Sequence, residues 1–461
     1  MIGFYFTYIM SGSAFALGWV NPAYGLMVYY ALAILRPIFL WFWAFNPYDA
    51  PRFSFYVGIS TLAGWLFSGL GNWSGLKGTK LAMFGLVSYF IFGIVAWQLN
   101  GISDDICLNQ LDILAKILVM AFATLTLIRD ERSIRIFGWV MVASLGYLGY
   151  TLNEWYRINP MYLHNNGFAT IDNNGVGMIM VMAVPLSFFL GVLDGRWWVR
   201  LLCFFAVACE VHVILFSYSR GSQLGLIIVG AAIFFFALMH LPRKLMTLTF
   251  AAIFVFITLQ LAGEGVRARF LSIFAEERDA SAESRFKTWG AALDCIRDYP
   301  MGVGPRNFGI HAPKYGLTFG KAVHNLFLQT GADYGVGGMI GLALFYFATF
   351  WFAFRMASSK VSKTLLWPRY YALATCTSLG GFLICSIFIG MENVEVAYMI
   401  AILGLTNIAF VNRVASAGPI LATRELPELI QVVPPGASDE EEAQRNPNAA
   451  PHPVFGNLNP A

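Results

Sequence analysis

Charged residues are scarce in this chain of 461 residues: Asp, Glu, Lys and Arg together make up 12%, whereas hydrophobic residues make up 58%. A soluble domain carries about a quarter charged residues, so this chain lacks the polar surface that a soluble protein needs. Runs of roughly 20 apolar residues, the length that spans a bilayer, recur throughout. Because irregular backbone cannot face lipid, we predict an all-α, polytopic integral membrane protein. The net charge of +4 is mild and predicts no nucleic-acid partner.

The chain also lacks the short motifs of several enzyme classes. Asp-x-Asp, His-Glu-x-x-His, Gly-x-Ser-x-Gly and Walker sequences are absent, which disfavours metal-dependent sugar transfer, proteolysis, esterase chemistry and ATP use. We therefore expect neither a metal ion nor another cofactor. The N-terminus has no basic region and no small-residue cleavage site, so we expect the first apolar run to be retained. The cysteines show no paired metal-ligand spacing and are interpreted as small core residues: Cys107, Cys203, Cys209, Cys295, Cys376 and Cys385.

Thirteen apolar runs are candidate membrane spans, so we predict about twelve or thirteen transmembrane helices, with fourteen also compatible with the pattern. In the second run, Arg36-Pro37 predicts that the helix ends there and that residues 38–45 lie along the membrane or re-enter it. The runs are 2–18, 22–45, 53–71, 81–98, 110–128, 136–152, 174–193, 201–217, 222–239, 245–262, 325–355, 370–390 and 396–411.

Short loops predict the orientation of the chain, because Lys and Arg accumulate on the cytoplasmic side of a membrane. The other side then receives every long loop except the C-terminal tail. Five basic clusters fall on one side of the predicted spans: Lys77/Lys80, Arg129/Arg132/Arg135, Arg196/Arg200, Arg243/Lys244 and Lys360/Lys363/Arg369.

Two segments differ from the rest in composition. Residues 263–323 contain nine basic and seven acidic residues, 26% of the stretch, and are predicted to form a folded or docked external loop. Residues 414–461 hold eight of the nineteen prolines and an acidic run at Asp439 to Glu442, which is typical of a disordered, cytoplasmic tail. We predict an N-terminal transmembrane region (1–160), a second transmembrane domain (161–412) and the tail (413–461).

Arg220 lies in an external turn, Ser217 to Ser222, between two strongly apolar spans. A charge at membrane depth is costly and requires a reason. It is either a snorkelling or helix-capping arginine, or a phosphate ligand, because a guanidinium binds phosphate through two hydrogen bonds and keeps its charge. Gly221 and Ser219 would let backbone and hydroxyl groups approach the same anion.

Arg285 is a second candidate, within the charged loop. It lies on a predicted amphipathic helix that ends at a tight turn, where Pro300 is followed by Gly302-Val303-Gly304. It is either a solvated loop charge or a ligand. The glycines lack the Lys-Ser/Thr of a nucleotide-binding loop. The apolar face of the helix is expected to comprise Phe286, Trp289, Leu293 and Ile296.

His324 stands where the charged loop re-enters the membrane, beside Asn325 and Gln329. It is either a structural histidine or a proton acceptor near neutral pH. Glycines around Asp333 predict a helix kink or close helix packing; they are Gly331, Gly335, Gly337 and Gly338.

Other polar residues at the outer boundary add to these candidates. Asp172 is a plausible helix N-cap, whereas Asn173 and Asn174 are candidates for hydrogen bonds to sugar hydroxyls. Glu392 and Glu395 are expected to be external and able to assist a proton transfer.

Three blocks in order resemble the O-antigen ligase and polymerase family, over roughly residues 160–410. The resemblance implies that 161–412 is an O-antigen ligase-like domain of the GT-C type. The N-terminal part, with Pro22 and Arg36-Pro37, resembles the O-glycosylation ligases of exosortase-associated systems. The blocks are Tyr218-Ser219-Arg220-Gly221, Arg285 to Trp289 followed by Gly302-Val303-Gly304, and His324-Asn325 followed by Gly335 to Gly338.

The resemblance implies a metal-independent, inverting glycosyltransferase that uses undecaprenyl-diphosphate-linked glycans on the periplasmic face of a bacterial inner membrane. It implies diphosphate binding by Arg220 and Arg285 and a catalytic role for His324, which would take the acceptor proton. The acceptor would be a glycan, a lipid or a protein. Residues expected to contact substrate are Ser219, Asn173, Asn174 and Asn325.

Two alternatives stay open. An O-antigen or exopolysaccharide polymerase of the same fold would use a lipid-linked glycan as acceptor too. A multispan transporter or lipid flippase would place Arg220 and His324 along a substrate pathway. Transporters usually show repeated halves and broken helices at the bilayer midplane, whereas the polar residues here gather at the outer boundary.

Overall fold

In the computed structural model of this protein, the described residues are 2–45, 50–240, 263–271, 280–358, 366–392 and 394–417. Within these ranges the elements are helices and there is no strand element, which confirms the predicted all-α fold. Seven of the described helices are long and apolar enough to cross a membrane, in agreement with a polytopic membrane protein. They are α5 (Lys80–Asn100), α6 (Asp104–Leu127), α9 (Asn173–Leu193), α10 (Trp197–Phe216), α11 (Arg220–His240), α16 (Leu326–Ser358) and α19 (Glu395–Ala417).

The other predicted apolar runs also contain helices wherever the structure describes them. The run 245–262 and the tail from residue 418 lie outside the described residues, so the total number of spans and the disorder of the tail stay predictions. The further helices in these runs are α1 (Ile2–Leu17), α2 (Pro22–Leu35), α3 (Pro37–Leu40), α4 (Phe53–Phe67), α7 (Glu131–Ile158) and α18 (Leu366–Cys385).

The second helix ends where Arg36-Pro37 predicts. Arg36 follows α2 with a left-handed backbone, φ 44°, and Pro37 begins the short α3. The Arg36 guanidinium donates to the carbonyl of Ala169 at 2.8 Å and lies 3.9 Å from a carboxylate oxygen of Glu395. This polar contact attaches the N-terminal region to the segment that leads into α9.

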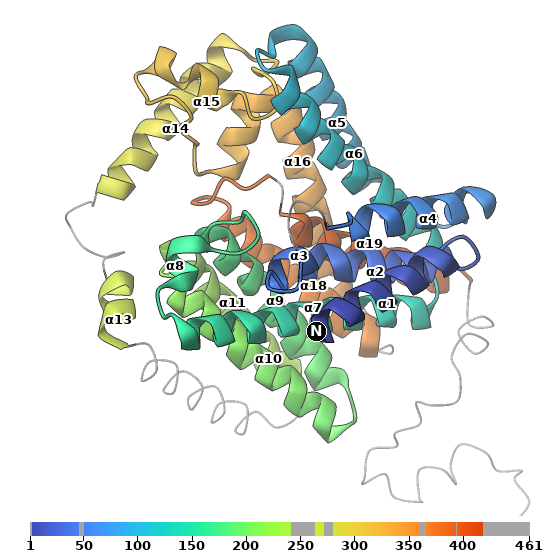
Figure 1. Cartoon of the computed structure of the whole chain (residues 1–461). Coiled ribbons are helices and arrows are strands. Elements are labelled where there is room, and N and C mark those ends of the chain that lie inside the picture. The colour runs from blue at the N-terminus through green and yellow to red at the C-terminus, as the bar shows by residue number, and fades with distance from the viewer. Residues whose placement is uncertain are drawn as a thin grey trace, which may run out of the picture. The chain divides into compact units, whose positions relative to one another are not determined.

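Helix α9 is the central element of a bundle with α7, α10, α11 and α18 (Figure 1). Of its apolar stretch 83% is buried, against 28% for α11. Small residues permit the close approach, since a Cβ on Gly191 would come within 2.6 Å of the Cβ of Cys203. All six cysteines are buried and form no disulfide, as expected of core residues.

Helix α16 is bent at Gly335, whose φ of 75° and ψ of 177° interrupt the helix as the glycines predict. The turn Gly302-Val303-Gly304 packs into this bend, and a Cβ on Gly302 would come within 2.4 Å of the Gly335 nitrogen. The N–H groups of Val303 and Gly304 donate to helix carbonyls just before the bend, at 2.9 and 3.0 Å. The bend therefore receives its missing hydrogen bonds from the turn.

The charged segment 263–323 is folded where it is described. Its helices are α13 (Gly263–Leu271), α14 (Ala280–Asp298), α15 (Phe308–His311) and the 3-10 helix η1 (Ala312–Tyr315). Helices α14 and α15 stand with the first part of α16 on one side of the bundle, whereas α13 lies beside α11 (Figure 1). Helices α14, α15 and η1 share a small core with α16, whereas Val266 of α13 packs against Phe216. The core consists of Ala291, Ala292, Cys295, Val303, Phe308, Ala312, Val323 and Ala332.

The predicted apolar face of α14 is partly wrong. Trp289 and Ile296 pack against this core, but Phe286 and Leu293 are 49% and 46% exposed. The small residues Ala291, Ala292 and Cys295 take the buried positions instead, because they let α14 approach the turn and α15 closely.

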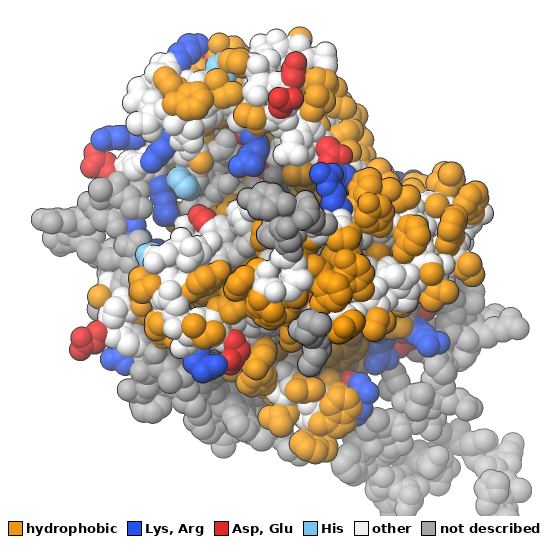
Figure 2. All heavy atoms as spheres, in the orientation of Figure 1, with side chains coloured by type: hydrophobic (Ala, Val, Ile, Leu, Met, Phe, Trp, Pro, Cys, Tyr) orange, Lys and Arg blue, Asp and Glu red, His pale blue; other side chains and the backbone are white. Residues whose placement is uncertain are grey.

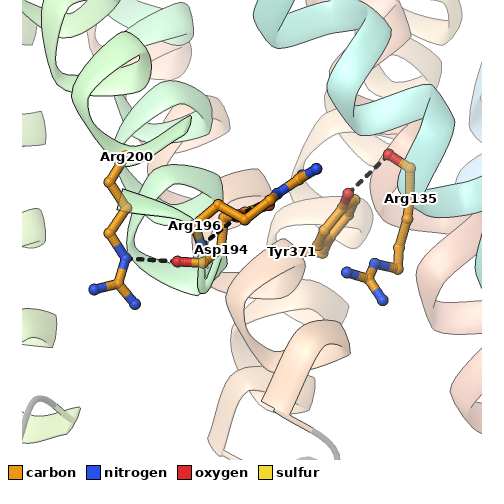
Figure 3. A network of polar contacts seen from close by, with 5 residues as sticks. All are labelled: Arg135, Asp194, Arg196, Arg200 and Tyr371. Atoms are coloured by element: carbon orange, nitrogen blue, oxygen red, sulfur yellow. Dashed lines mark hydrogen bonds and ion pairs between the residues drawn. The ribbon is translucent and has the colours of Figure 1, made fainter. Parts of the chain in front are cut away.

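Two of the predicted basic clusters meet in one polar network (Figure 3). Arg196 donates to the Asp194 carboxylate at 2.8 Å, and Arg200 donates to the Asp194 carbonyl. Nearby, the Tyr371 hydroxyl donates to the carbonyl of Arg135 at 3.0 Å. The hydrogen bonds from Arg196 hold the pKa of Asp194 below its usual value, and the charge of Arg135 acts in the same direction. The sequence predicts that this network is cytoplasmic.

Candidate active site

The turn that carries Arg220 connects α10 to α11 tightly. Tyr218 has a positive φ of 54°, and Ser219, only 1% exposed, caps α11. The Ser219 Oγ accepts hydrogen bonds from the N–H of Ser222 at 3.4 Å and from its hydroxyl at 3.1 Å. Arg220 is the first residue of α11 and is half-buried, so the positive end of the helix and the guanidinium lie together. A substrate contact of Ser219 stays a prediction.

The start of α9 lies against this turn. Asp172 caps α9 by accepting an N–H of its first turn at 2.8 Å, in agreement with its interpretation as an N-cap. The Asn173 amide donates to the carbonyl of Ser217 at 2.8 Å and lies 3.3 Å from Nδ1 of His164. The Asn174 amide donates to Asp172 at 3.1 Å. These contacts join α9 to the Arg220 turn, and sugar binding by the two asparagines stays a prediction.

His324 has an unusual backbone conformation. Its φ of 56° lies in the left-handed region, which costs a residue with a side chain roughly 1–2 kcal/mol. The flanking residues are fixed: the Val323 N–H donates to Oε1 of Gln329 at 2.8 Å, and the Leu326 N–H donates to the Ser386 carbonyl at 2.8 Å. Strain of this kind persists where the surroundings over-determine it, and it is common at functional sites.

Residues 388–391, which follow α18 and which we call the connecting segment, bring two of the predicted blocks together. A Cβ on Gly390 would lie 3.3 Å from the backbone nitrogen of His324. At the other end of the segment, the Cβ of Phe388 lies 3.3 Å from where a Cβ of Gly221 would be. The start of α11 and the histidine therefore border the same short stretch of chain.

Helix α14 reaches the same place. The Trp289 ring lies 6.4 Å from the ring of Phe388, centroid to centroid. Thr288, which is fully buried, donates to the carbonyl of Val323 at 3.1 Å. Arg285 is half-buried and lies one turn earlier on the same helix. The structure thus brings Arg220, Arg285 and His324 together around the connecting segment.

The electrostatics of His324 reflect this convergence. Burial lowers the pKa of its ring below the usual value, the charge of Arg285 lowers it further, and Lys321 adds to the effect. The carboxylate of Asp172 opposes them. The ring is therefore neutral, and able to accept a proton, at neutral pH. Figure 2 shows Lys, Arg and His side chains gathered on the hollowed face between α14 and α8 (Tyr162–Asn166).

The remaining predicted residues have structural partners. The side-chain oxygen of Asn325 accepts the Leu328 N–H at 3.0 Å and so caps α16, and its substrate contact stays a prediction. Glu395 is the ion-pair partner of Arg36. Glu392 is not an exposed carboxyl: it is 8% exposed, and burial, with the charge of Asp333 adding to it, raises its pKa well above the usual value. Among the described residues, no three His, Cys, Asp or Glu side chains form a group able to hold a metal ion.

Sequence reasoning missed the connecting segment and the hydrogen bonds behind His324. The amide of Gln329 donates to one carboxylate oxygen of Asp333 at 2.6 Å, and the Phe308 N–H donates to the other at 2.7 Å. A Gln and an Asp four residues apart at a helix start were a usable signal, because such residues share one helix face. The connecting segment offers no such signal, since its residues are apolar or glycine.

A comparison with protein families matches residues 205–346 to the O-antigen ligase family. No curated protein matches the chain. The matched stretch contains all three blocks, from Tyr218-Ser219-Arg220-Gly221 to the glycines after His324. It supports membrane glycan transfer of the O-antigen ligase or polymerase type. Residues 205–346 are therefore similar to the O-antigen ligase family.

Proposed function

We propose that this protein transfers a glycan from an undecaprenyl-diphosphate carrier to an acceptor hydroxyl on the periplasmic face of a bacterial inner membrane. The similarity of residues 205–346 to the O-antigen ligase family supports the general reaction. The observation that carries the proposal is the convergence of Arg220, Arg285 and His324 on the connecting segment.

The two arginines stabilise the leaving group in this proposal. When the bond between the anomeric carbon and the diphosphate oxygen breaks, the electron pair leaves with the diphosphate, which gains negative charge. Guanidinium groups bind phosphate oxygens bidentately and stay charged at any physiological pH. Arg220 and Arg285 are both half-buried, so their charges are less screened than at an open surface. This arrangement neutralises the leaving group without a metal ion.

His324 acts on the acceptor. The acceptor oxygen forms the new bond to the anomeric carbon from the side opposite the diphosphate, so the configuration at that carbon inverts. The hydroxyl proton passes to a ring nitrogen of His324, which is neutral beforehand because burial and Arg285 lower its pKa. The protonated histidine then releases the proton to water.

The same chemistry serves a polymerase when the acceptor is itself a lipid-linked glycan. Glycan profiling of a deletion strain separates the two. Loss of a ligase leaves finished polymer on the lipid carrier, whereas loss of a polymerase leaves single repeat units. The family match favours glycan transfer over a transporter.

Transfer by the purified protein, with a lipid-linked glycan as donor, tests the mechanism. His324→Ala should abolish transfer while donor binding is largely kept, because the diphosphate contacts belong to the arginines. His311→Ala, on the same external segment, is the matched control and should keep turnover. EDTA should have no effect. The proposed base is wrong if His324→Ala retains turnover, and the metal-free mechanism is wrong if EDTA stops the reaction and added metal restores it.

A further inference from the structure

We propose that Gln329 and Asp333 are positioning residues, which hold His324 in the orientation that proton transfer requires. The inference rests on the proposed function, because it assumes that His324 is the base. It extends that function to two buried residues on α16.

The contacts form one chain of hydrogen bonds. The backbone N–H of Val323, the residue before His324, donates to Oε1 of Gln329 at 2.8 Å. The amide nitrogen of Gln329 donates to Oδ2 of Asp333 at 2.6 Å, and the Phe308 N–H donates to Oδ1 of Asp333 at 2.7 Å. Val323 and Asp333 are fully buried and Gln329 is 8% exposed, so water does not compete for these groups.

These hydrogen bonds determine which way the Gln329 amide faces. Three links must be made, and each needs one acceptor oxygen: one on Gln329 and two on Asp333. The carboxylate of Asp333, held by Phe308, accepts from the Gln329 amide nitrogen and so turns the amide oxygen towards Val323. A fixed Val323 then supports the strained φ of 56° at His324.

The number of hydrogen-bond acceptor oxygens can be changed and then restored by exchanging the amide and the carboxylate between positions 329 and 333. Asp333→Asn leaves two acceptor oxygens for three links, so one link must be lost. Gln329→Met keeps the approximate size of the side chain and removes both of its links. The double variant Gln329→Glu/Asp333→Asn again has three acceptors, and its net charge equals that of the wild type. A carboxylate at 329 would accept from both Val323 and the new asparagine amide.

Donor and acceptor kinetics of the purified variants provide the readout. Asp333→Asn and Gln329→Met should lower kcat by about tenfold to a hundredfold, the scale expected for a misplaced catalytic group, with the KM for the donor within about twofold of wild type. The double variant should recover most of the kcat lost in Asp333→Asn. Thr330→Val is the matched control: Thr330 is buried beside Gln329 but bonds only the helix carbonyl of Leu326, so kcat should be unchanged.

Melting temperature and gel filtration identify any variant that fails to fold, and the kinetic comparison then uses the others. The inference is wrong if folded Asp333→Asn or Gln329→Met turns over within twofold of wild type. It is also wrong if the double variant is no faster than Asp333→Asn. His324→Ala in the same assay separates the two hypotheses. If it stays active, the proposed base fails; if it is inactive while Asp333→Asn is normal, only the positioning role fails.

Discussion

At the scale of single residues, the candidate site combines two side chains of permanent charge with one that titrates. Arg220 and Arg285 keep their charge at any physiological pH. His324 alone of the three changes charge near neutrality, and its surroundings move that change to lower pH. The two kinds of residue can therefore be tested by different measurements.

The arginines should be sensitive to the shape of the cation. Lys keeps the charge but loses the two-pronged hydrogen bonding, so Arg220→Lys and Arg285→Lys should each lose on the order of 2–4 kcal/mol of transition-state stabilisation, measured as kcat/KM in the transfer assay. Arg297→Lys, on the same helix as Arg285 but exposed and paired with Asp294, should be near normal. Near-normal transfer by both Arg220→Lys and Arg285→Lys would show that only the positive charge matters and would contradict bidentate binding of the diphosphate.

Substitutions of two charged neighbours of His324 should shift the pH dependence of activity in opposite directions. A base must be neutral, so activity falls as the pH drops through the pKa of His324. We call this fall the acid limb of the pH–activity profile. Burial and the charge of Arg285 lower the pKa of His324, so the acid limb lies below pH ~6.5. Asp172→Asn removes a carboxylate that favours the charged ring, so the limb should shift to lower pH, while asparagine keeps the helix cap. Lys321→Gln removes a repelling charge, so the limb should shift to higher pH. A profile that responds to neither change would assign the limb to another group.

At the scale of elements, two glycines that face each other hold the charged segment 263–323 on α16. Gly302 has a φ of 87° and Gly335 a φ of 75°. A Cβ on Gly302 would lie 2.4 Å from the backbone nitrogen of Gly335, and a Cβ on Gly335 would lie 2.5 Å from the backbone carbonyl carbon of Met301. The bend in α16 and the turn after α14 therefore depend on each other. Because α14 carries Arg285 and the start of α16 follows His324, this junction sets the geometry of the site.

Gly302→Ala should destabilise the protein by about 2 kcal/mol or more, since it combines a left-handed backbone with a clash against Gly335. The melting temperature in detergent should fall by several degrees. Gly290→Ala is the matched control. It lies inside α14 with nothing within 4 Å of the new methyl group, so it should be neutral or slightly stabilising. An unchanged melting temperature for Gly302→Ala would contradict the described junction.

At the scale of the whole molecule, the described residues up to Arg413 form one compact unit. The division of this unit at residue 160 stays a prediction, as does the assignment of its two faces to periplasm and cytoplasm. The predicted basic clusters at Arg135 and at Arg196 and Arg200 do come together in one network (Figure 3).

Cysteine labelling tests the orientation with little background, because all six native cysteines are buried. Thr318→Cys lies on the charged segment and Gly195→Cys beside the basic network, and both positions are exposed. In spheroplasts, an impermeant maleimide should label residue 318 and should label residue 195 only after the membrane is permeabilised. The reverse pattern would invert the topology and rule out a periplasmic reaction.

The sequence by itself determined the helical membrane fold, because the scarcity of charge and the length of the apolar runs leave no other way to satisfy the backbone in lipid. It also singled out Arg220 and His324, because isolated polar residues at an apolar boundary are conspicuous, whereas the role of Arg285, within the charged segment, came from the family resemblance. Only the tertiary structure showed that these residues converge, since the connecting segment that joins them is apolar and carries no local signal. The face of α14 and the hydrogen bonds from Gln329 to Asp333 were likewise decided by packing, because which side of a helix is buried, and which donor meets which acceptor, depends on neighbours that are distant in the chain.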